Sequence, residues 1–154
     1  MGVTEKKRDE IYYKAALRII RVSEYIKGKR RRELSKLNVS LVRGAIIRHI
    51  VRLGKKATLS ELSRRVIKEP HGISMLVSRM EKEGLVRRIR DLHRKNLVRV
   101  ELTKKGRELH ELVAIDTVTV PVISCLTVEE VKELVIILDK IIEYEKQYPV
   151  LSPH

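Results

Sequence analysis

The sequence predicts a mainly α-helical protein that carries one small β-hairpin. Apolar residues recur at helical spacing over most of the 154-residue chain, and the spacing becomes alternate only between residues 85 and 102. The length suits one folded domain. Of the residues, 43% are hydrophobic but none is Phe or Trp, so Val, Ile and Leu must form the core.

Residues 58–84 predict two short helices joined by a tight turn. The first helix begins at Thr58, which forms a capping box with Glu61. Pro70 then interrupts the apolar pattern and suits the first turn of a second helix. That helix ends at Gly84, which can adopt the left-handed conformation that closes a helix. Together the two segments predict a helix-turn-helix.

Two strands follow, at residues 85–90 and 97–102, joined by a polar tip at 91–96. The second strand alternates, with Val98 and Val100 on its apolar face. A helix-turn-helix followed directly by a basic hairpin predicts a winged helix, a module that lays its second helix in a DNA major groove.

Three segments carry a more specific pattern: LSEL at 59–62, VSRMEKEGLVRR at 77–88 and ELTKKGREL at 101–109. With the hairpin between them, they resemble the MarR (multiple antibiotic resistance regulator) family of transcriptional regulators. The resemblance implies a homodimer whose amino- and carboxy-terminal helices form a dimerisation region. It also implies an effector that is an aromatic acid or another small lipophilic compound.

The net charge of +14 is unevenly distributed. Residues 37–102 hold 16 basic and 6 acidic side chains, whereas residues 103–154 carry a net charge of −3. Basic charge concentrated on the predicted winged helix is typical of a surface that binds a polyanion, here double-stranded DNA. The alternative is a solvated basic surface without a partner.

The outward face of the second helix supplies the candidate DNA-reading residues. Arg79 can donate two hydrogen bonds to guanine, and Met75 suits a thymine methyl group. The full set is His71, Gly72, Ser74, Met75, Ser78 and Arg79. Because this set contains few strong base readers, we expect part of the specificity to come from wing residues in a narrow minor groove. The wing candidates are Arg88, Arg90, His93, Arg94 and Lys95.

The amino-terminal part predicts two further helices. Residues 5–27 carry an apolar stripe that includes Ile11 and Ile19, and a dense basic run follows at 27–32. That run is either a solvated linker or a phosphate contact. Asn38 or Ser40 can cap a helix that runs to Leu53. Its His49 fits the edge of the core better than a metal site.

Beyond Thr103 a helix resumes, and a β-branched run ending in Pro121 predicts that it is kinked or broken between residues 116 and 121. A final helix, capped at Thr127, is apolar on nearly all sides, which predicts burial against a second subunit. The expected dimer core is Ile19, Val131, Leu134, Leu138, Ile141 and Ile142. The chain then divides into dimerisation helix and basic linker (1–36), winged helix (37–103) and carboxy-terminal dimerisation helices (104–154).

Several functions lack support in the sequence. We find no nucleophile elbow, phosphate-binding glycine loop or paired metal ligands, so we expect no enzymatic activity, metal or cofactor. Cys125 is the only cysteine, and we interpret it as a buried, inert thiol rather than a redox sensor. Because no signal peptide or membrane-spanning run is present, we expect a cytoplasmic protein without a membrane partner.

These observations predict a homodimeric, sequence-specific transcriptional regulator, with a repressor relieved by a small ligand as the form that the resemblance implies. Two alternatives remain: an architectural protein that coats DNA with little sequence preference, and a ligand sensor for which DNA binding is secondary. The residues select neither an operator sequence nor an effector pocket.

Overall fold

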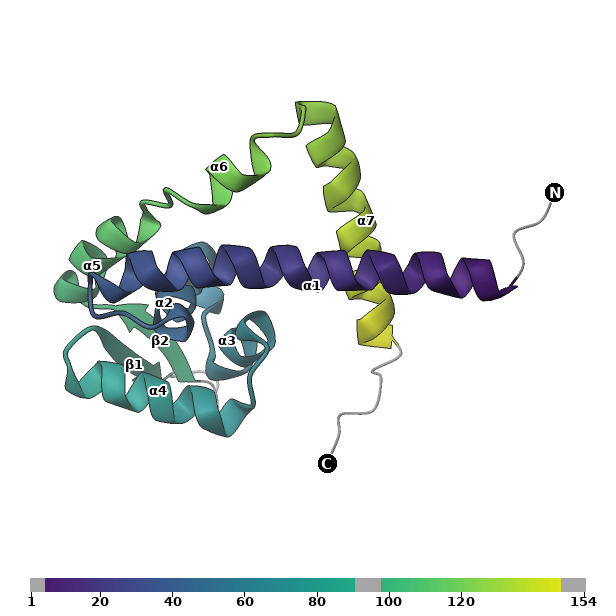
Figure 1. The fold of residues 1–154 in the computed structure, drawn as a ribbon. Helices are drawn as coiled ribbons and strands as arrows, with labels where there is room; N and C mark the ends of the chain where they lie inside the picture. Colours follow the sequence, from purple (N-terminus) through teal and green to yellow (C-terminus); the bar gives the residue numbers. More distant parts are fainter. Residues whose placement is uncertain (1–4, 91–97, 148–154) are drawn as a thin grey trace. The chain divides into compact units, whose positions relative to one another are not determined.

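The computed structural model describes residues 5–90 and 98–147. The chain forms two compact units, residues 1–116 and residues 117–154. Figure 1 shows the elements in chain order: helices α1 to α5 and both strands belong to the first unit, and helices α6 and α7 to the second. The predicted mainly helical fold with a small hairpin is confirmed.

Helix α1 extends from Glu5 to Ser35 and continues through the basic run that the sequence suggested as a linker. Lys and Arg favour helix, and the single glycine of the run, Gly28, does not end it. Arg30 is also anchored, being only 3% exposed. Its guanidinium donates to the backbone oxygens of Val113 and, at 2.9 Å, Ile115. The end of α1 is thereby fixed to the chain that follows the hairpin.

Helix α2 (Leu41–Leu53) begins at Ser40, whose side chain caps the helix as one of the two predicted candidates. A single turn of 3₁₀ helix, η1 (Gly54–Lys56), leads into α3 (Leu59–Val66) and then α4 (Pro70–Lys82). The predicted helix-turn-helix is therefore present.

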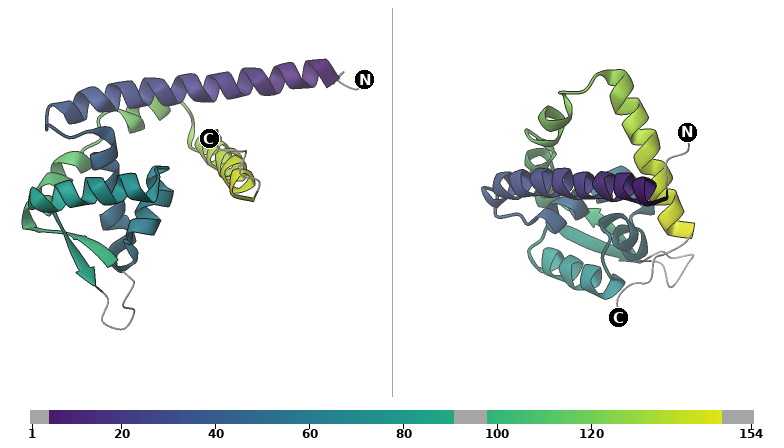
Figure 2. Two further views of the ribbon diagram at one scale, coloured as in Figure 1. Left: turned by 90° about the horizontal axis from the view of Figure 1, so that it is seen from below. Right: turned by 45° about the vertical axis from the view of Figure 1, so that its right-hand side comes forward.

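The wing consists of two antiparallel strands, β1 (Val86–Arg90) and β2 (Val98–Leu102), which extend away from the helices as a narrow hairpin (Figure 2). Leu85, predicted as the first strand residue, instead donates its N–H to an α4 carbonyl and so completes the helix end. Ala57, just before α3, accepts the Val100 N–H at 2.8 Å. The segment before α3 thus adds a short third edge to the hairpin, with Thr58 bridging to Arg99.

The core of the first unit is aliphatic and lies between α2, α3, α4 and the hairpin. A smaller cluster joins the end of α1 to α2 and α5. The largest fully buried side chains are Leu34, Ile46, Ile47, Leu62, Ile73, Met80, Val77, Val86, Val100 and Val113. Aliphatic side chains therefore close this core, as the composition predicted.

Helix α5 (Lys104–Ala114) begins directly after the wing, with Thr103 accepting the Gly106 N–H at 3.1 Å. A Cβ atom on Gly106 would lie 2.0 Å from the carbonyl oxygen of Leu85. Glycine is thus required for α5 to approach the base of the hairpin this closely.

The predicted break after α5 is confirmed, since the helix ends at Ala114 and α6 (Thr119–Ile123) is a separate short helix. The gap is at residues 115–118, slightly earlier than expected. Pro121 lies in the first turn of α6, where a missing backbone donor costs little. The helix is therefore interrupted by the residues before Pro121, which have low helix propensity, rather than by the proline itself.

Helix α7 (Val128–Gln147) begins at the predicted cap, Thr127, which forms a capping box with Glu130 through hydrogen bonds of 3.2 and 2.8 Å. Cys125, just before it, is exposed in this chain, so the expectation of a buried thiol is wrong. No single helix in the described part is long and apolar enough to cross a membrane, although one bent pair, 104–123 with 128–147, meets the length and composition criteria together.

Candidate DNA-binding surface

The turn between α3 and α4 is fixed by Ser63. Its backbone oxygen accepts the N–H groups of Ile67 and Lys68, and its hydroxyl donates to the Lys68 oxygen. Ile67 adopts left-handed backbone angles (φ 53°, ψ 58°), which are rare for a β-branched residue. Pro70 then occupies the first turn of α4, as predicted. This turn sets the direction of α4 relative to α3.

Helix α4 has one buried side and one open side. Ile73, Val77 and Met80 are completely buried in the core. The opposite side carries all the residues predicted to read DNA: His71, Met75 and Arg79 are exposed, and Gly72, Ser74 and Ser78 are partly exposed. A Cβ on Gly72 would meet no atom within 4 Å, so the backbone there is open to close approach.

The carboxyl end of α4 forms a Schellman motif. The Gly84 N–H donates to the Glu81 oxygen and the Leu85 N–H to the Met80 oxygen, each at 2.9 Å. Gly84 has φ of +72°, which confirms the predicted left-handed position. Because Met80 and Leu85 are both buried, an apolar contact accompanies the motif. The hairpin therefore leaves α4 in a defined direction.

Arg88 and Ser78, predicted to contact DNA, are both engaged within the protein. The Arg88 guanidinium donates to Glu81 Oε2 at 2.9 Å, to the Ser74 oxygen at 3.0 Å and to Ser78 Oγ at 2.9 Å. Ser78 Oγ in turn donates to the Ser74 oxygen at 2.9 Å. Glu81, the acidic partner of Arg88, was not predicted from the sequence. Residue spacing does not reveal that β1 folds back over this part of α4.

The remaining wing candidates are divided by what the structure describes. Arg90, at the end of β1, is exposed. His93, Arg94 and Lys95 lie outside the described residues. On the other face of the hairpin, Arg87 donates to Glu101 Oε2 at 3.1 Å, an exposed pair that the sequence analysis did not single out.

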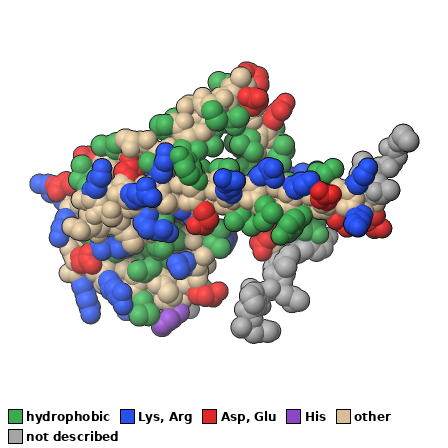
Figure 3. All heavy atoms as spheres, viewed as in Figure 1, with side chains coloured by type: hydrophobic (Ala, Val, Ile, Leu, Met, Phe, Trp, Pro, Cys, Tyr) green, Lys and Arg blue, Asp and Glu red, His purple; other side chains and the backbone are tan. Residues whose placement is uncertain are grey.

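Figure 3 shows many basic side chains on one face of the first unit, together with apolar side chains of α1. The pKa of His49, a half-buried residue of α2, responds to this positive charge. Burial lowers the pKa of His49, and repulsion from Arg52, Arg65 and Arg48 lowers it further. Burial and the neighbouring Arg30 likewise lower the pKa of Arg48, against the attraction of Asp116. A positive potential of this kind favours a polyanion.

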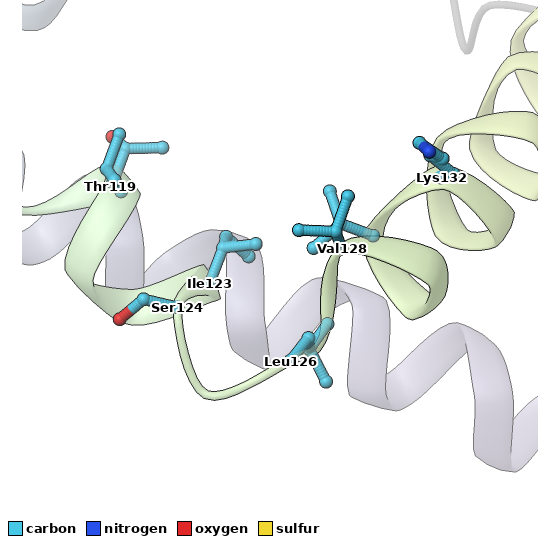
Figure 4. Close-up of a pocket in the computed structure, with 8 residues that line it drawn as sticks. Thr119, Ile123, Ser124, Leu126, Val128 and Lys132 are labelled. Atoms are coloured by element: carbon cyan, nitrogen blue, oxygen red, sulfur yellow. The ribbon is translucent and has the colours of Figure 1, made fainter.

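The second unit contains a separate hollow of about 570 Å³ between α6 and the start of α7. Figure 4 shows Ile123, Leu126 and Val128 around the turn that joins the two helices, with Lys132 further along α7. The walls are mostly apolar, and Lys132 is the charged residue among those that line it. The sequence did not predict a pocket here.

The described part of the chain contains no cluster of three His, Cys, Asp or Glu side chains able to hold an ion. His49 lies beside three arginines, which would oppose a cation. What the first unit does present is a helix with an open polar side, a basic hairpin beside it and a positive surface around both.

Comparison with family models and with curated proteins gave no match to this sequence. Comparison with solved structures gave many. The organohalide-sensing transcriptional regulator RdhR-CbdbA1625, in its 2,4-dichlorophenol-bound form, is 32% identical, with 94% of this chain and 86% of that chain covered and a TM-score of 0.72.

Two more distant structures share the fold. The Staphylococcus aureus regulator MepR, solved with DNA, is 20% identical, with 86% of this chain and 96% of that chain covered and a TM-score of 0.70. AbsC, a MarR family transcriptional regulator from Streptomyces coelicolor, is 20% identical, with 96% and 99% covered and a TM-score of 0.76. Taken with the winged helix, the similarity to RdhR over nearly the whole chain shows that this protein belongs to the MarR family of DNA-binding transcriptional regulators.

Proposed function

We propose that the protein is a homodimeric regulator that binds a specific DNA sequence and represses transcription until a small ligand releases it. The division of α4 into a buried and an open side carries the DNA-binding part of this proposal. Ile73, Val77 and Met80 fix the helix to the core. The opposite side is then available to face base edges in a major groove.

Two residues of α4 are the proposed base readers. The exposed Arg79 guanidinium can bond to both acceptors of a guanine, and exposed Met75 can pack on a thymine methyl group. Gly72 allows the helix backbone to come close to the DNA. His71 and Ser74 are placed for phosphate or base contacts near the start of the helix.

The wing is proposed to enter the adjacent minor groove. Arg90 is exposed at the end of β1, and His93, Arg94 and Lys95 follow it in the sequence. A narrow minor groove concentrates negative potential and attracts such cations, so the wing would sense DNA shape rather than base identity. This would compensate for the few base readers on α4.

Dimerisation is proposed from the apolar side chains that the single chain leaves exposed. In α1, Ile11 and Ile20 are each 58% exposed, and in α7, Ile136 is 67% exposed. Large apolar side chains exposed in such number along a helix support an interface. The proposed dimer core comprises Ile19, Val131, Leu134, Leu138, Ile141 and Ile142, all exposed or partly exposed in this chain.

A small aromatic or lipophilic effector is the proposed ligand. RdhR was solved with 2,4-dichlorophenol, an aromatic compound with an acidic hydroxyl. The hollow beside α6 offers this chain apolar walls and the ammonium group of Lys132, a combination that suits the same chemistry. Bound ligand could lower DNA affinity only by preferring a state that holds DNA poorly.

Selection of genomic fragments by the purified protein tests the DNA-binding proposal. We expect enriched fragments to share a pseudo-palindrome whose half-site centres are roughly 34 Å apart, one turn of DNA. Enrichment without a shared motif, with selected and random DNA bound equally well at fixed salt, would instead identify an architectural protein.

Titration of the selected DNA with 2,4-dichlorophenol and a panel of phenolic acids tests the effector. At least one compound should weaken binding by roughly fivefold or more, the lower range of allosteric coupling. Lys132→Met should reduce that response while leaving ligand-free DNA affinity unchanged. If no compound changes the affinity, the regulator does not respond to this class of ligand.

A further inference from the structure

We infer that Arg88 and Glu81 form a clamp that sets the angle between the wing and α4, and that Arg88 serves DNA recognition by positioning these elements rather than by touching DNA. This inference rests on the proposed role of α4 and the wing as the two DNA-contacting elements. It reassigns Arg88, which the sequence suggested as a wing contact.

The first observation is that both edges of the hairpin are tied to the helix-turn-helix at one level. Arg88 and Val100 are directly opposite each other in the register. The Val100 N–H points away from β1 and donates to the Ala57 oxygen at 2.8 Å. The Arg88 N–H donates to Glu81 Oε1, also at 2.8 Å. An edge strand normally leaves such a donor to water, whereas here α4 supplies the acceptor.

The second observation is the number of α4 groups that one guanidinium engages. It bonds to Glu81 Oε2, the Ser74 oxygen and Ser78 Oγ, at distances of 2.9 to 3.0 Å. Ser74, Ser78 and Glu81 follow one another along one side of α4 at helical spacing. Three contacts in a row define a direction as well as a distance, so they resist rotation of the hairpin about its base.

A planar guanidinium is suited to this task. Its donors are fixed in a fork, whereas a lysine ammonium is a point charge on a flexible stem. The Arg88 side chain is also only 26% exposed, which leaves it less accessible to a phosphate than Arg87, at 65%. Burial and saturated bonding both oppose a direct DNA contact by Arg88.

The clamp matters because α4 and the wing must engage neighbouring grooves together. A hairpin held at the right angle loses less conformational entropy on binding than one that must be ordered by DNA. Loosening the joint should therefore weaken binding to a specific site. It should not weaken the electrostatic attraction to DNA of any sequence, which depends on charge.

A phosphate-contact role for Arg88 gives opposite expectations. Removing the Glu81 carboxylate would then free a cation and reduce repulsion, so Glu81→Gln would strengthen binding to all DNA. Arg88→Ala would lower the slope of log affinity against log salt by about 0.9. Arg88→Lys would keep most of the affinity, since lysine also binds phosphate.

The test measures binding of the full-length protein to two probes at several salt concentrations: the tightest fragment that the wild type selects from a random pool, and random DNA of equal length. The variants are Glu81→Gln, Arg88→Ala, Arg88→Lys and the Glu81→Gln, Arg88→Ala double variant. Arg87→Ala and Glu101→Gln are matched controls, because they break an Arg–Glu pair on the opposite, exposed face of the same hairpin.

We expect Glu81→Gln and Arg88→Ala each to weaken specific binding roughly tenfold, within the usual range for coupled contacts. The double variant should be no weaker than Arg88→Ala, and Arg88→Lys should not rescue. The salt slope of Arg88→Ala and the random-DNA affinity of Glu81→Gln should not fall. A lower slope for Arg88→Ala, or tighter binding by Glu81→Gln to both probes, overturns the clamp.

A measurement without DNA separates this inference from the proposed function. The Arg88 amide of the free wild-type protein should be protected from hydrogen exchange, and Glu81→Ala should remove that protection while buried core amides keep theirs. An unprotected Arg88 amide in the wild type overturns the clamp whatever the protein binds. A wild type that does not distinguish selected from random DNA overturns the proposed sequence-specific function instead, and leaves the exchange result to decide the clamp.

Discussion

The winged helix and helix α7 differ in whether they can bury their own apolar side chains. The winged helix, from α2 to the hairpin, encloses a cluster that includes Ile46, Leu62 and Val100, all completely buried. Among the described residues of α7 none is buried, although Ile136, Ile137 and Ile141 are as apolar as the core. The winged helix thus buries its apolar side chains within a single chain, whereas α7 leaves its own exposed or partly exposed.

The difference shows that hydrophobicity alone does not locate a monomer's core. Apolar side chains of α2 meet others brought to them by α3, α4 and β2, which are close along the chain. Those of α7 have no comparable set of nearby elements, since the described part of the second unit contains only the short α6 besides. Changes in the two regions should therefore have different consequences.

The largest effect is expected from charging α7. Leu138→Glu should abolish the folded dimer, since an uncompensated charge buried in an interface costs roughly 3–5 kcal/mol for each copy. Sedimentation measures the loss of the dimer. All five tyrosines lie before residue 26 or after residue 143, so near-ultraviolet circular dichroism reports on the chain ends rather than on the winged helix.

Lys140→Glu is the control for Leu138→Glu, because it adds a negative charge at an exposed position of the same helix. It should leave the dimer intact. If the Leu138→Glu protein sediments as a dimer with an unchanged tyrosine signal, α7 does not form the dimer interface. The proposed difference between the two regions would then be wrong.

Truncation in the complete core should have the next largest effect. Ile46→Ala deletes buried methyl groups and should lower the free energy of unfolding by about 2–5 kcal/mol. Val51→Ala on the same helix removes apolar atoms from a side chain that is 47% exposed. It should change the free energy of unfolding by less than about 0.5 kcal/mol. Urea denaturation followed by far-ultraviolet circular dichroism measures both, and equal losses would show that α2 is not packed as described.

Two glycine substitutions should have opposite effects on the stability of the protein. Gly106→Ala forces a Cβ against the Leu85 carbonyl and should destabilise the protein by about 1–3 kcal/mol. Gly28→Ala, where a Cβ meets no atom within 4 Å, should stabilise α1 by up to about 1 kcal/mol. Melting temperatures of the two variants give the signs directly. A stabilising Gly106→Ala would mean that α5 does not pack against the base of the hairpin.

Much of this arrangement could be predicted from local patterns. The helix-turn-helix, the alternating strand, the Ser40 cap and the capping box at Thr127 each depend on residues close together in the sequence, and the structure contains all of them. The Thr58 box is only half formed: its hydroxyl accepts the Glu61 N–H, but the Thr58 N–H donates to Lys56. An alternative backbone acceptor nearby was enough to replace one predicted bond.

Contacts between distant residues could not be predicted in the same way. Arg30 stood in a run of basic residues, and nothing local indicated that it would be buried against the end of α5. The partners of Arg88 depend on how β1 packs against α4. The pattern of charges along the sequence does not specify that packing. The candidate site was therefore predictable as a surface, but the division of its residues into contacts and supports was not.

The smallest expected effect concerns the charge of the winged helix. Because burial and the repulsion of three arginines lower the pKa of His49, the folded protein binds a proton there less readily than the unfolded chain. His49 therefore contributes its full stability above the ordinary histidine pKa of about 6.5. That contribution is lost as the pH falls towards the lower pKa of the folded state.

His49→Gln should flatten the dependence of unfolding free energy on pH in this acidic window, whereas His71→Gln, on the exposed side of α4, serves as the control for losing a histidine. Salt separates the two causes. Screening weakens repulsion from Arg52, Arg65 and Arg48 but leaves burial unchanged. Nuclear magnetic resonance titration of His49 should thus show its pKa rising with salt yet staying below the ordinary value. A pKa that is normal at low salt would contradict both the burial of His49 and the positive potential that we assign to the first unit.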